Sequence, residues 1–303
     1  MLTQNLQDRD ETREPAPRDF IGRSDLRSWL AIGRDWSIII ALIVISEWAG
    51  VWWFTGLAVL GIGALQFALG EALLHDASHY NLFGNRSLND RMGLLYALPF
   101  LTTVEDWRAE HLTHHRSLGM ADDHIVQDYS ALGLTSNPAR PAWVWFGKPI
   151  FGITAIDHLR HLWTMNATRS WVRIGVFWGV VAAVCVFQGV LPELMLYWFL
   201  PMITVFATLL HWSEIADHYR TQSGTRSRTS RVHNWLWHNN GYHATHHEYP
   251  AVPFHRLRQA HQALGDAEGD SAKGWWAVWR QISRPHESAP ERWARFWPPF
   301  RST

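Results

Sequence analysis

The sequence predicts an all-α integral membrane protein, with four transmembrane helices in two hairpins and a cytosolic helical cap. Residues 36–74 contain only two charged side chains, Glu47 and Glu71. Residues 174–210 contain only one, Glu193. At about 1.5 Å per residue, either stretch would form a helix longer than about 50 Å, whereas the hydrocarbon core of a bilayer is about 30 Å thick. Each stretch is therefore expected to reverse once and to cross the membrane twice.

These boundaries divide the chain into three parts. Residues 1–34 are polar and lack the apolar core of a signal peptide, so we expect a cytosolic N-terminal tail. Residues 35–265 form the expected membrane domain, and residues 266–303 form an interfacial or cytosolic C-terminal segment. The expected spans, with reversals near Trp52–Gly56 and at Gly189 and Pro192, are about residues 36–53, 56–75, 172–190 and 193–213.

Charge predicts the orientation. Lys and Arg are absent from both expected hairpin loops, near Trp53 and at residues 188–193, and occur in the polar segments. The positive-inside rule therefore places both termini and the cap in the cytoplasm, and we expect a multi-pass protein of a bacterial inner membrane. Residues 92–104 are also apolar, but they are too few to span and are expected to be re-entrant or interfacial.

Composition argues against several functional classes. The chain has 303 residues and no formal net charge, which disfavours a nucleic acid partner because phosphate binding needs a basic surface. The single cysteine, Cys185, excludes an internal disulfide and a cysteine-ligated iron–sulfur cluster. Several tryptophans near the C-terminus predict either an interfacial segment or packing against the cap: Trp275, Trp276, Trp279, Trp293 and Trp297.

Three histidine clusters carry the predicted chemistry. Spacings of three and four residues place imidazoles on one face of a helix. One such pair is a weak signal, but three clusters in one chain are typical of a metal site. The clusters are His75 with His79, His111 with His114 and His115, and His243 with His246 and His247.

The end of the last predicted span supplies a fourth contribution. Glu214 and His218 lie four residues apart, and ionisable residues at a membrane boundary are candidates for function. His218 is the expected ninth ligand, whereas Glu214 is expected to bind metal directly, to act through water or to orient His218. His211 lies almost two turns deeper and is a weaker candidate.

This ligand set requires two metal ions, because it exceeds what one ion binds. Structural zinc is satisfied by four ligands, usually including cysteine, so the set does not fit a structural zinc site. Imidazole also suits iron and copper, and the residues alone leave these two metals open.

The order of the clusters and their flanks resemble the membrane fatty acid desaturase family. The matching segments are His75-Asp-Ala-Ser-His79 with Leu82-Phe83, Trp107-Arg-Ala-Glu-His111, and Asn240-Gly-Tyr-His243 with His246-His247-Glu-Tyr-Pro250. The resemblance covers roughly residues 36–262 and implies a four-helix membrane fold, two iron ions and O2 as co-substrate. It implies nine iron ligands: His75, His79, His111, His114, His115, His218, His243, His246 and His247. Glu214 departs from the pattern of acyl-CoA desaturases, which carry an amide there, and this weakens transfer of an acyl-CoA substrate.

Several residues beside the clusters are expected to support them. Asp76 and Glu110 are expected to orient ligands, and together with Glu214 they are the predicted catalytic residues. Other histidines are expected to be surface, solvated or capping residues: His158 and His161 on a surface helix, and His233, His238, His255 and His261. Residues 122–124 are expected to form a turn.

The predicted function is O2-dependent desaturation or hydroxylation of an unactivated C–H position in an apolar, lipid-like substrate dissolved in membrane lipid. The alternative is a hydroxylase or ketolase of a carotenoid or specialised metabolite. More remote alternatives are a metal transporter, whose ligands would line a path near the bilayer midplane, and a metal-binding receptor. Because the sequence carries no iron–sulfur or dinucleotide motif, we expect an external electron donor of the ferredoxin, rubredoxin or cytochrome type.

Overall fold

The computed structural model describes residues 14–134, 140–265 and 270–283. It confirms a mostly helical protein and adds one small parallel sheet, in which β1 (Arg226–Arg228) pairs with β2 (Asp270–Ala272). The α-helices are α1 Asp25–Ala49, α2 Trp52–Phe67, α3 Leu74–Ser78, α4 Arg86–Arg91, α5 Gly93–Tyr96, α6 Val104–Ser117, α7 His124–Ala131, α8 Lys148–Ile150, α9 Ile153–Met165, α10 Thr168–Gln188, α11 Leu191–Leu194, α12 Ala207–His218, α13 Arg231–Leu236, α14 His243–Glu248, α15 Phe254–Leu264 and α16 Trp275–Ile282.

Short helical segments of other types interrupt or join these helices. Two are 3-10 turns, η1 Pro17–Asp19 and η3 Leu98–Phe100. The others are π-helical, with one extra residue per turn: η2 Ala68–Leu73, η4 Trp143–Gly147, η5 Met195–Phe199 and η6 Met202–Phe206.

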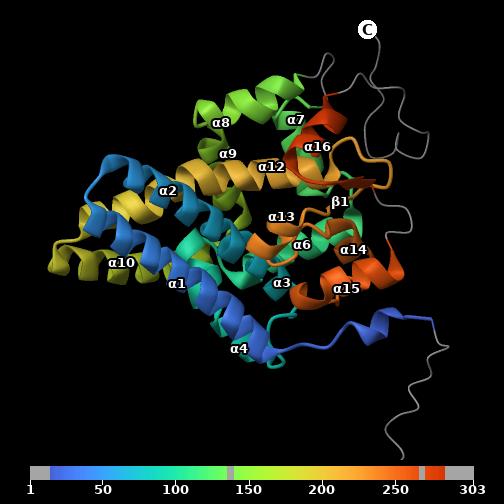
Figure 1. The fold of residues 1–303 in the computed structure, drawn as a ribbon, viewed down its shortest axis with the longest axis horizontal. Coiled ribbons are helices and arrows are strands. Elements are labelled where there is room, and N and C mark those ends of the chain that lie inside the picture. Colours follow the sequence, from blue (N-terminus) through green and yellow to red (C-terminus); the bar gives the residue numbers. More distant parts are fainter. Residues whose placement is uncertain (1–13, 135–139, 266–269, 284–303) are drawn as a thin grey trace, which may run out of the picture.

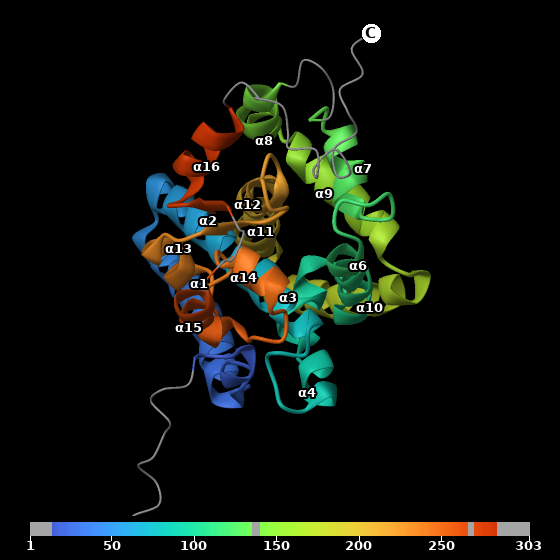
Figure 2. The same ribbon diagram turned by 90° about the vertical axis from the view of Figure 1, so that its right-hand side faces the viewer.

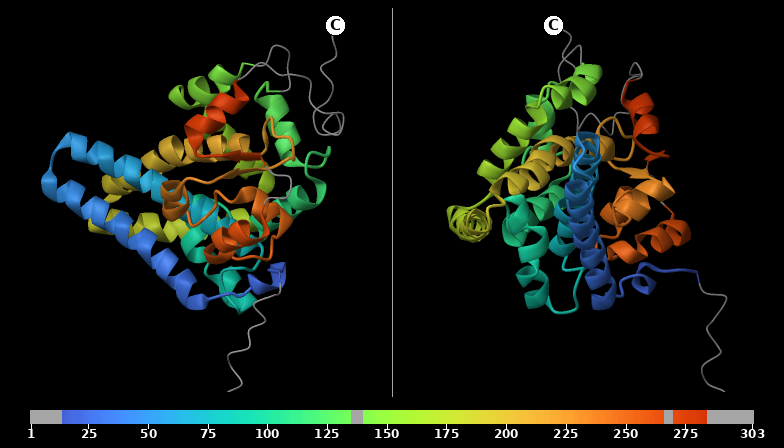
Figure 3. Two further views of the ribbon diagram at one scale, coloured as in Figure 1. Left: turned by 45° about the vertical axis from the view of Figure 1, so that its right-hand side comes forward. Right: turned by 60° about the vertical axis from the view of Figure 1, so that its left-hand side comes forward.

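Four helices are long and apolar enough to cross a membrane, as predicted. They are Asp25–Ala49, Trp52–Ser78, Thr168–Gln188 and Leu191–His218. The second combines α2, η2 and α3, and the fourth combines α11, η5, η6 and α12. In Figure 1 these helices extend to one side, while α6, α14 and α15 gather at the other. Figures 2 and 3 show the same gathering from other sides.

The ends of the long helices follow from local chain chemistry. α1 begins at Asp25, well before the expected span at residue 36, because the Ser24 hydroxyl caps it and accepts a hydrogen bond from the Arg27 N–H. It ends at Gly50, whose φ of 61° is accessible to glycine at little cost. Gly189, with φ of 71°, ends α10 in the same way. Glycine caps therefore separate the first long helix from the second and the third from the fourth, and the first cap, Gly50, precedes the expected region Trp52–Gly56.

The apolar stretch 92–104 packs largely into the core, although Leu94 is exposed. It forms the short elements α5 and η3, which Pro99 helps to separate. Phe100 is buried against Trp198 and Phe206, with ring centroids 5.5 and 5.2 Å apart. The neighbouring backbone at Gly70 approaches this ring so closely that a Cβ there would lie 2.5 Å from Phe100 Cγ.

Two of the C-terminal tryptophans pack within the molecule. Trp275 and Trp279 pack against Trp145, with ring centroids 6.3 and 6.2 Å away, whereas the Trp276 side chain is exposed. Internal packing therefore accounts for two of the three described tryptophans of this segment. Trp293 and Trp297 lie outside the described residues.

We expect Gly63→Ala to destabilise the helix bundle. A Cβ at Gly63 in α2 would lie 2.4 Å from Val205 Cβ in η6, so the two helices would have to separate. The melting temperature in detergent, followed by fluorescence-detected size exclusion, should fall. The control is Gly175→Ala in α10, where a Cβ meets nothing within 4 Å. An equal effect of both substitutions would contradict close packing at Gly63.

Candidate metal centre

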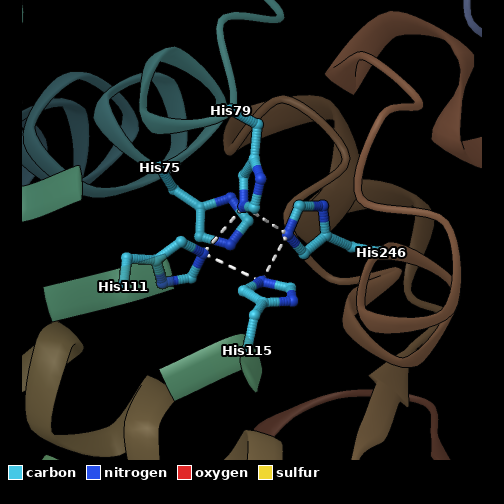
Figure 4. Close-up of side chains that lie close together, drawn as sticks. All are labelled: His75, His79, His111, His115 and His246. Atoms are coloured by element: carbon cyan, nitrogen blue, oxygen red, sulfur yellow. Dashed lines mark hydrogen bonds between the residues drawn. The ribbon is translucent and has the colours of Figure 1, made fainter. Parts of the chain in front are cut away.

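The structure gathers nine histidines into two groups of ring nitrogens. Within each group the candidate ligand atoms all lie within 4.8 Å of one another. The first group contains five residues, His75, His79, His111, His115 and His246 (Figure 4). The second contains four residues, His114, His218, His243 and His247. These are the nine positions that the sequence patterns singled out as candidate ligands.

The first group joins three segments that are distant in the sequence. His75 and His79 come from the end of α3, His111 and His115 from α6, and His246 from α14. The Nε2 atom of His111 lies 3.0 Å from the Nε2 atoms of His79 and of His115. His246 Nε2 lies 3.1 Å from His115 Nε2. The rings therefore face a common centre, as Figure 4 shows.

The second group lies beside the first and shares two of its helices. His114 is on α6, His243 and His247 are on α14, and His218 ends α12. His218 Nε2 lies 2.9 Å from His243 Nε2, and His114 Nε2 lies 3.3 Å from His247 Nε2. The two groups therefore form adjacent donor sets.

The helices that carry these rings are placed by identifiable local features. Thr103 begins α6 by accepting a hydrogen bond from the Asp106 N–H. The π-helical segments η2 and η6 precede α3 and α12, and the extra residue per turn changes which side chains face the centre. Gly241 lets α14 approach β1, because a Cβ there would lie 2.4 Å from the Arg228 carbonyl oxygen.

Burial favours the neutral form of several of these imidazoles. Burial, reinforced by neighbouring histidines, holds the pKa of His111, His243, His246 and His247 well below the usual range. The same causes lower the pKa of His115 to about 2. Neutral imidazoles offer lone pairs to a metal. His75 Nε2 is buried without a hydrogen-bond partner among the described residues. The donor set therefore fits two metal ions.

Asp123 contacts a ligand, which the sequence interpretation missed. Residues 122–124 were expected to form only a turn, but the buried Asp123 carboxylate accepts a hydrogen bond from His114 Nδ1 at 3.0 Å. It also begins α7 by accepting from the Ile125 N–H. The sequence did contain a sign of this contact, because Asp123 follows the cluster of His111, His114 and His115 closely. One further group holds a ligand ring, because the Gly224 carbonyl accepts from His218 Nδ1 at 2.8 Å. An Asp217 oxygen lies 3.9 Å from His243 Nδ1, which is too far for a hydrogen bond.

The three predicted catalytic carboxylates occupy different places. Asp76 accepts hydrogen bonds from the Phe254 N–H and the Asn81 amide, and so joins α3 to the start of α15. Glu110 pairs with His161, with 2.9 Å between Oε2 and Nε2. Glu214 Oε1 is buried without a partner in the described part of the chain. None of the three belongs to either group of histidine donors in that part of the chain.

Several other histidines have contacts that the sequence did not indicate. His158 and His161 were expected on a surface helix, and α9 does expose Ile156, Leu159 and Trp163, but both histidines line a cavity where α9 packs against α6 and α12. His233 and His238 were expected to be solvated or capping, but both are buried, and His238 Nε2 lies 2.7 Å from an Asp35 oxygen. These contacts join segments far apart in the sequence, so local spacing carries no sign of them.

A cavity of about 410 Å³ opens onto the histidines. Its wall includes five of them: His75, His111, His114, His218 and His243. Trp107 also lines it and packs edge-on against His75 and obliquely against His111, at centroid distances of 5.8 and 4.6 Å. Its size lies within the range of about 300–1,000 Å³ found for small-molecule sites.

Comparisons with known proteins agree with this geometry. The fatty acid desaturase family model matches residues 46–279. The chain belongs to the fatty acid desaturase family. It is therefore an oxidoreductase, as the resemblance predicted, and the family supports a membrane protein with iron chemistry.

Several curated desaturases are similar to this family member over most of its length. Dihydrorhizobitoxine desaturase of Bradyrhizobium elkanii is 30% identical over 257 residues, which cover 76% of this chain and 72% of the relative. An endoplasmic reticulum omega-3 fatty acid desaturase of Vigna radiata var. radiata is 24% identical, covering 82% and 75% respectively. The sn-1 oleoyl-lipid 12-desaturase of Anabaena variabilis is 24% identical, covering 77% and 59%.

We expect Asp123→Asn to weaken metal retention, because a neutral amide orients the His114 ring less strongly than a carboxylate does. Losing such a partner typically costs about 10–100-fold in metal affinity. Metal per protein, measured after dialysis against a graded chelator series, should fall at lower chelator concentration. The control is Asp122→Asn, whose carboxylate contacts Ser117 Oγ instead. Equal retention in both variants would show that Asp123 only caps α7.

Proposed function

We propose that this chain is a di-iron membrane oxidoreductase that uses O2 to desaturate an unactivated C–H position of a lipid or other apolar substrate. The observation that carries the proposal is the pair of adjacent and largely buried donor groups, with five and four histidines. The names of the relatives are those of desaturases, which supports desaturation over hydroxylation as the outcome.

The donor chemistry supports iron as the metal. His75, His79, His111, His115 and His246 would hold one ion, and His114, His218, His243 and His247 would hold the other. Neutral imidazole suits iron, and the described centre contains no thiolate. Two iron ions bound there would supply the O2 activation that oxidation of an unactivated C–H bond needs.

The reaction requires electrons that the chain does not carry. Desaturation removes two hydrogen atoms from adjacent carbons and reduces one O2 to two waters, so two further electrons and two protons must be supplied. Hydroxylation has the same requirement. Because Cys185 is the single cysteine, an iron–sulfur cluster within the chain is excluded, and we propose a ferredoxin, rubredoxin or cytochrome as the donor.

The cavity residues would hold the substrate beside the centre. Phe100, Phe206 and Leu210 form an apolar part of the wall, which excludes water from a bound hydrocarbon segment. Trp107 contacts two ligand rings and would fix the position of the bond that approaches them. Such positioning determines whether a reacting carbon lies within reach.

We propose a topology of two hairpins, with both termini and the histidine-bearing cap in the cytoplasm of a bacterial inner membrane. The turns at Gly50 and Gly189 lack nearby Lys and Arg, which supports this orientation. The donor groups lie at the ends of the second and fourth long helices, at His75 and His218, rather than at mid-span. This position favours an enzyme over a transporter, whose sites lie near the bilayer midplane.

The purified protein is expected to hold about two iron ions per chain. His79→Ala and His247→Ala each remove a donor from one group and should lower the iron content, measured by elemental analysis. The control is His255→Ala, because His255 belongs to neither group, and iron content should stay at the wild-type value.

The same variants test the reaction. A host expressing the wild type should accumulate a product two hydrogen atoms lighter than its precursor in lipid and metabolite profiles, and the His79→Ala and His247→Ala hosts should not. Iron-loaded wild type without any such product, in hosts supplying each class of electron donor, would contradict the proposed activity.

Reporter fusions at Met1 and Thr303 are expected to give cytoplasmic signals, because the basic residues lie in the segments that contain the termini. A fusion inserted at Gly189 should give the opposite signal. External signals from both terminal fusions would overturn the topology.

A further inference from the structure

The cavity beside the donor groups has a strongly acidic wall. Six carboxylates line it: Glu71, Glu110, Asp128, Asp157, Glu214 and Asp217. A site that bound only hydrocarbon would not bury this many charged groups, because each costs free energy to remove from water. The carboxylates are therefore a feature that an apolar substrate leaves unexplained.

Three of the six carboxylates already have a cationic partner. Glu110 pairs with His161 at 2.9 Å. Burial alone would raise the pKa of Glu110 and lower that of His161, but the attraction between the two groups is stronger. The pKa of Glu110 is therefore lowered and that of His161 is raised. Lys148 Nζ lies 3.3 Å from Asp157. Arg228 lies 2.8 Å from Asp217.

The other three carboxylates, those of Glu71, Asp128 and Glu214, have no ion pair or hydrogen bond with any residue that the structure describes. Glu214 Oε1 is moreover buried. The like charge of Asp128 is the group that acts most strongly on Glu214. Burial raises the pKa of the Asp128 carboxyl; the positive charge of His161 opposes this rise, and neighbouring carboxylates add to it. Asp128 and Glu214 therefore form an acidic pair without an ion-pair partner of its own among the described residues, since the neighbouring His161 is already paired with Glu110.

The position of Glu214 relates this pair to the reacting centre. Glu214 and His218 are four residues apart in α12, which corresponds to about 6 Å along the helix axis. His218 lies in the second donor group and lines the same cavity. A cation paired with Glu214 would therefore lie within one turn of a proposed iron ligand, close enough to share one small molecule with the centre.

We propose that the substrate carries an amine, and that its ammonium group binds between Asp128 and Glu214 while an apolar segment of the same molecule reaches the donor groups. This inference rests on the proposed function and names the substrate class of that site. The apolar wall at Phe100, Phe206 and Leu210 accommodates the hydrocarbon part. The oxidised carbons then lie only a few bonds from the nitrogen.

The test is a binding measurement that needs no turnover. Purified wild type is titrated at pH 7 with hexylamine, hexan-1-ol and hexanoate, and binding is followed by isothermal titration and by fluorescence of the tryptophans, of which Trp107 lines the cavity. We expect the amine to bind at least about tenfold more tightly than the alcohol, and hexanoate to bind most weakly, because hydrogen bonds to charged groups are strong and like charges repel.

Matched variants locate this preference. Glu214→Gln and Asp128→Asn remove the charge with little change in shape, and each should reduce the preference for the amine to about twofold or less while iron content and melting temperature stay at wild-type values. Glu105→Gln is the control, because Glu105 pairs with Arg173 at the surface and does not line the cavity. It should leave the preference unchanged.

Three results would overturn the proposal: equal binding of amine and alcohol to the wild type, an unchanged preference in both cavity variants, or loss of iron in those variants, which would make the carboxylates part of the metal centre. The proposed function fails differently. A wild type that prefers the amine but holds no iron would contradict the di-iron assignment and support the amine site.

Discussion

Nine closely spaced imidazoles, six of them buried and three partly buried, are the constraint on which the rest of the structure depends. Ring nitrogens as close as 2.9–3.3 Å can coexist only while the rings are uncharged, since two imidazolium ions at that distance would repel strongly. Burial provides this neutrality, and it also requires a rigid scaffold. Four segments far apart in the sequence, at α3, α6, α12 and α14, must meet in one place.

The helical bundle supplies that rigidity through close backbone contacts. Gly63 brings α2 against η6, and Gly241 brings α14 against β1, at distances that no larger residue permits. The buried Arg228 then pairs with Asp217, which in turn lies beside His243. Ligand positions are thus coupled to packing well away from the rings, so that a substitution at a helix contact can act on the metal centre.

The features that local sequence spacing determines were the predictable part of the structure. The spacing of His111, His114 and His115 selects one face of a helix whatever surrounds it, and length and hydropathy select the four long helices. The contacts of Asp123 and His161 were not predictable, because they depend on where α7 and α9 pack. The small β1–β2 sheet joins segments over 40 residues apart, and no local pattern marks it.

Charge balance separates two kinds of carboxylate near the centre. Neutral imidazoles contribute no charge, so two divalent ions bound there would leave a large positive charge, which nearby anions must offset. Asp123 and Asp217 suit this role, because they lie 3.0 and 3.9 Å from ligand rings. The carboxylates of Asp128 and Glu214 contact no ligand ring among the described residues and face a cavity instead. In the proposed amine site an ammonium group would pair with these two carboxylates and favour their charged form, and this would distinguish the cavity from the binding site of a plain hydrocarbon chain.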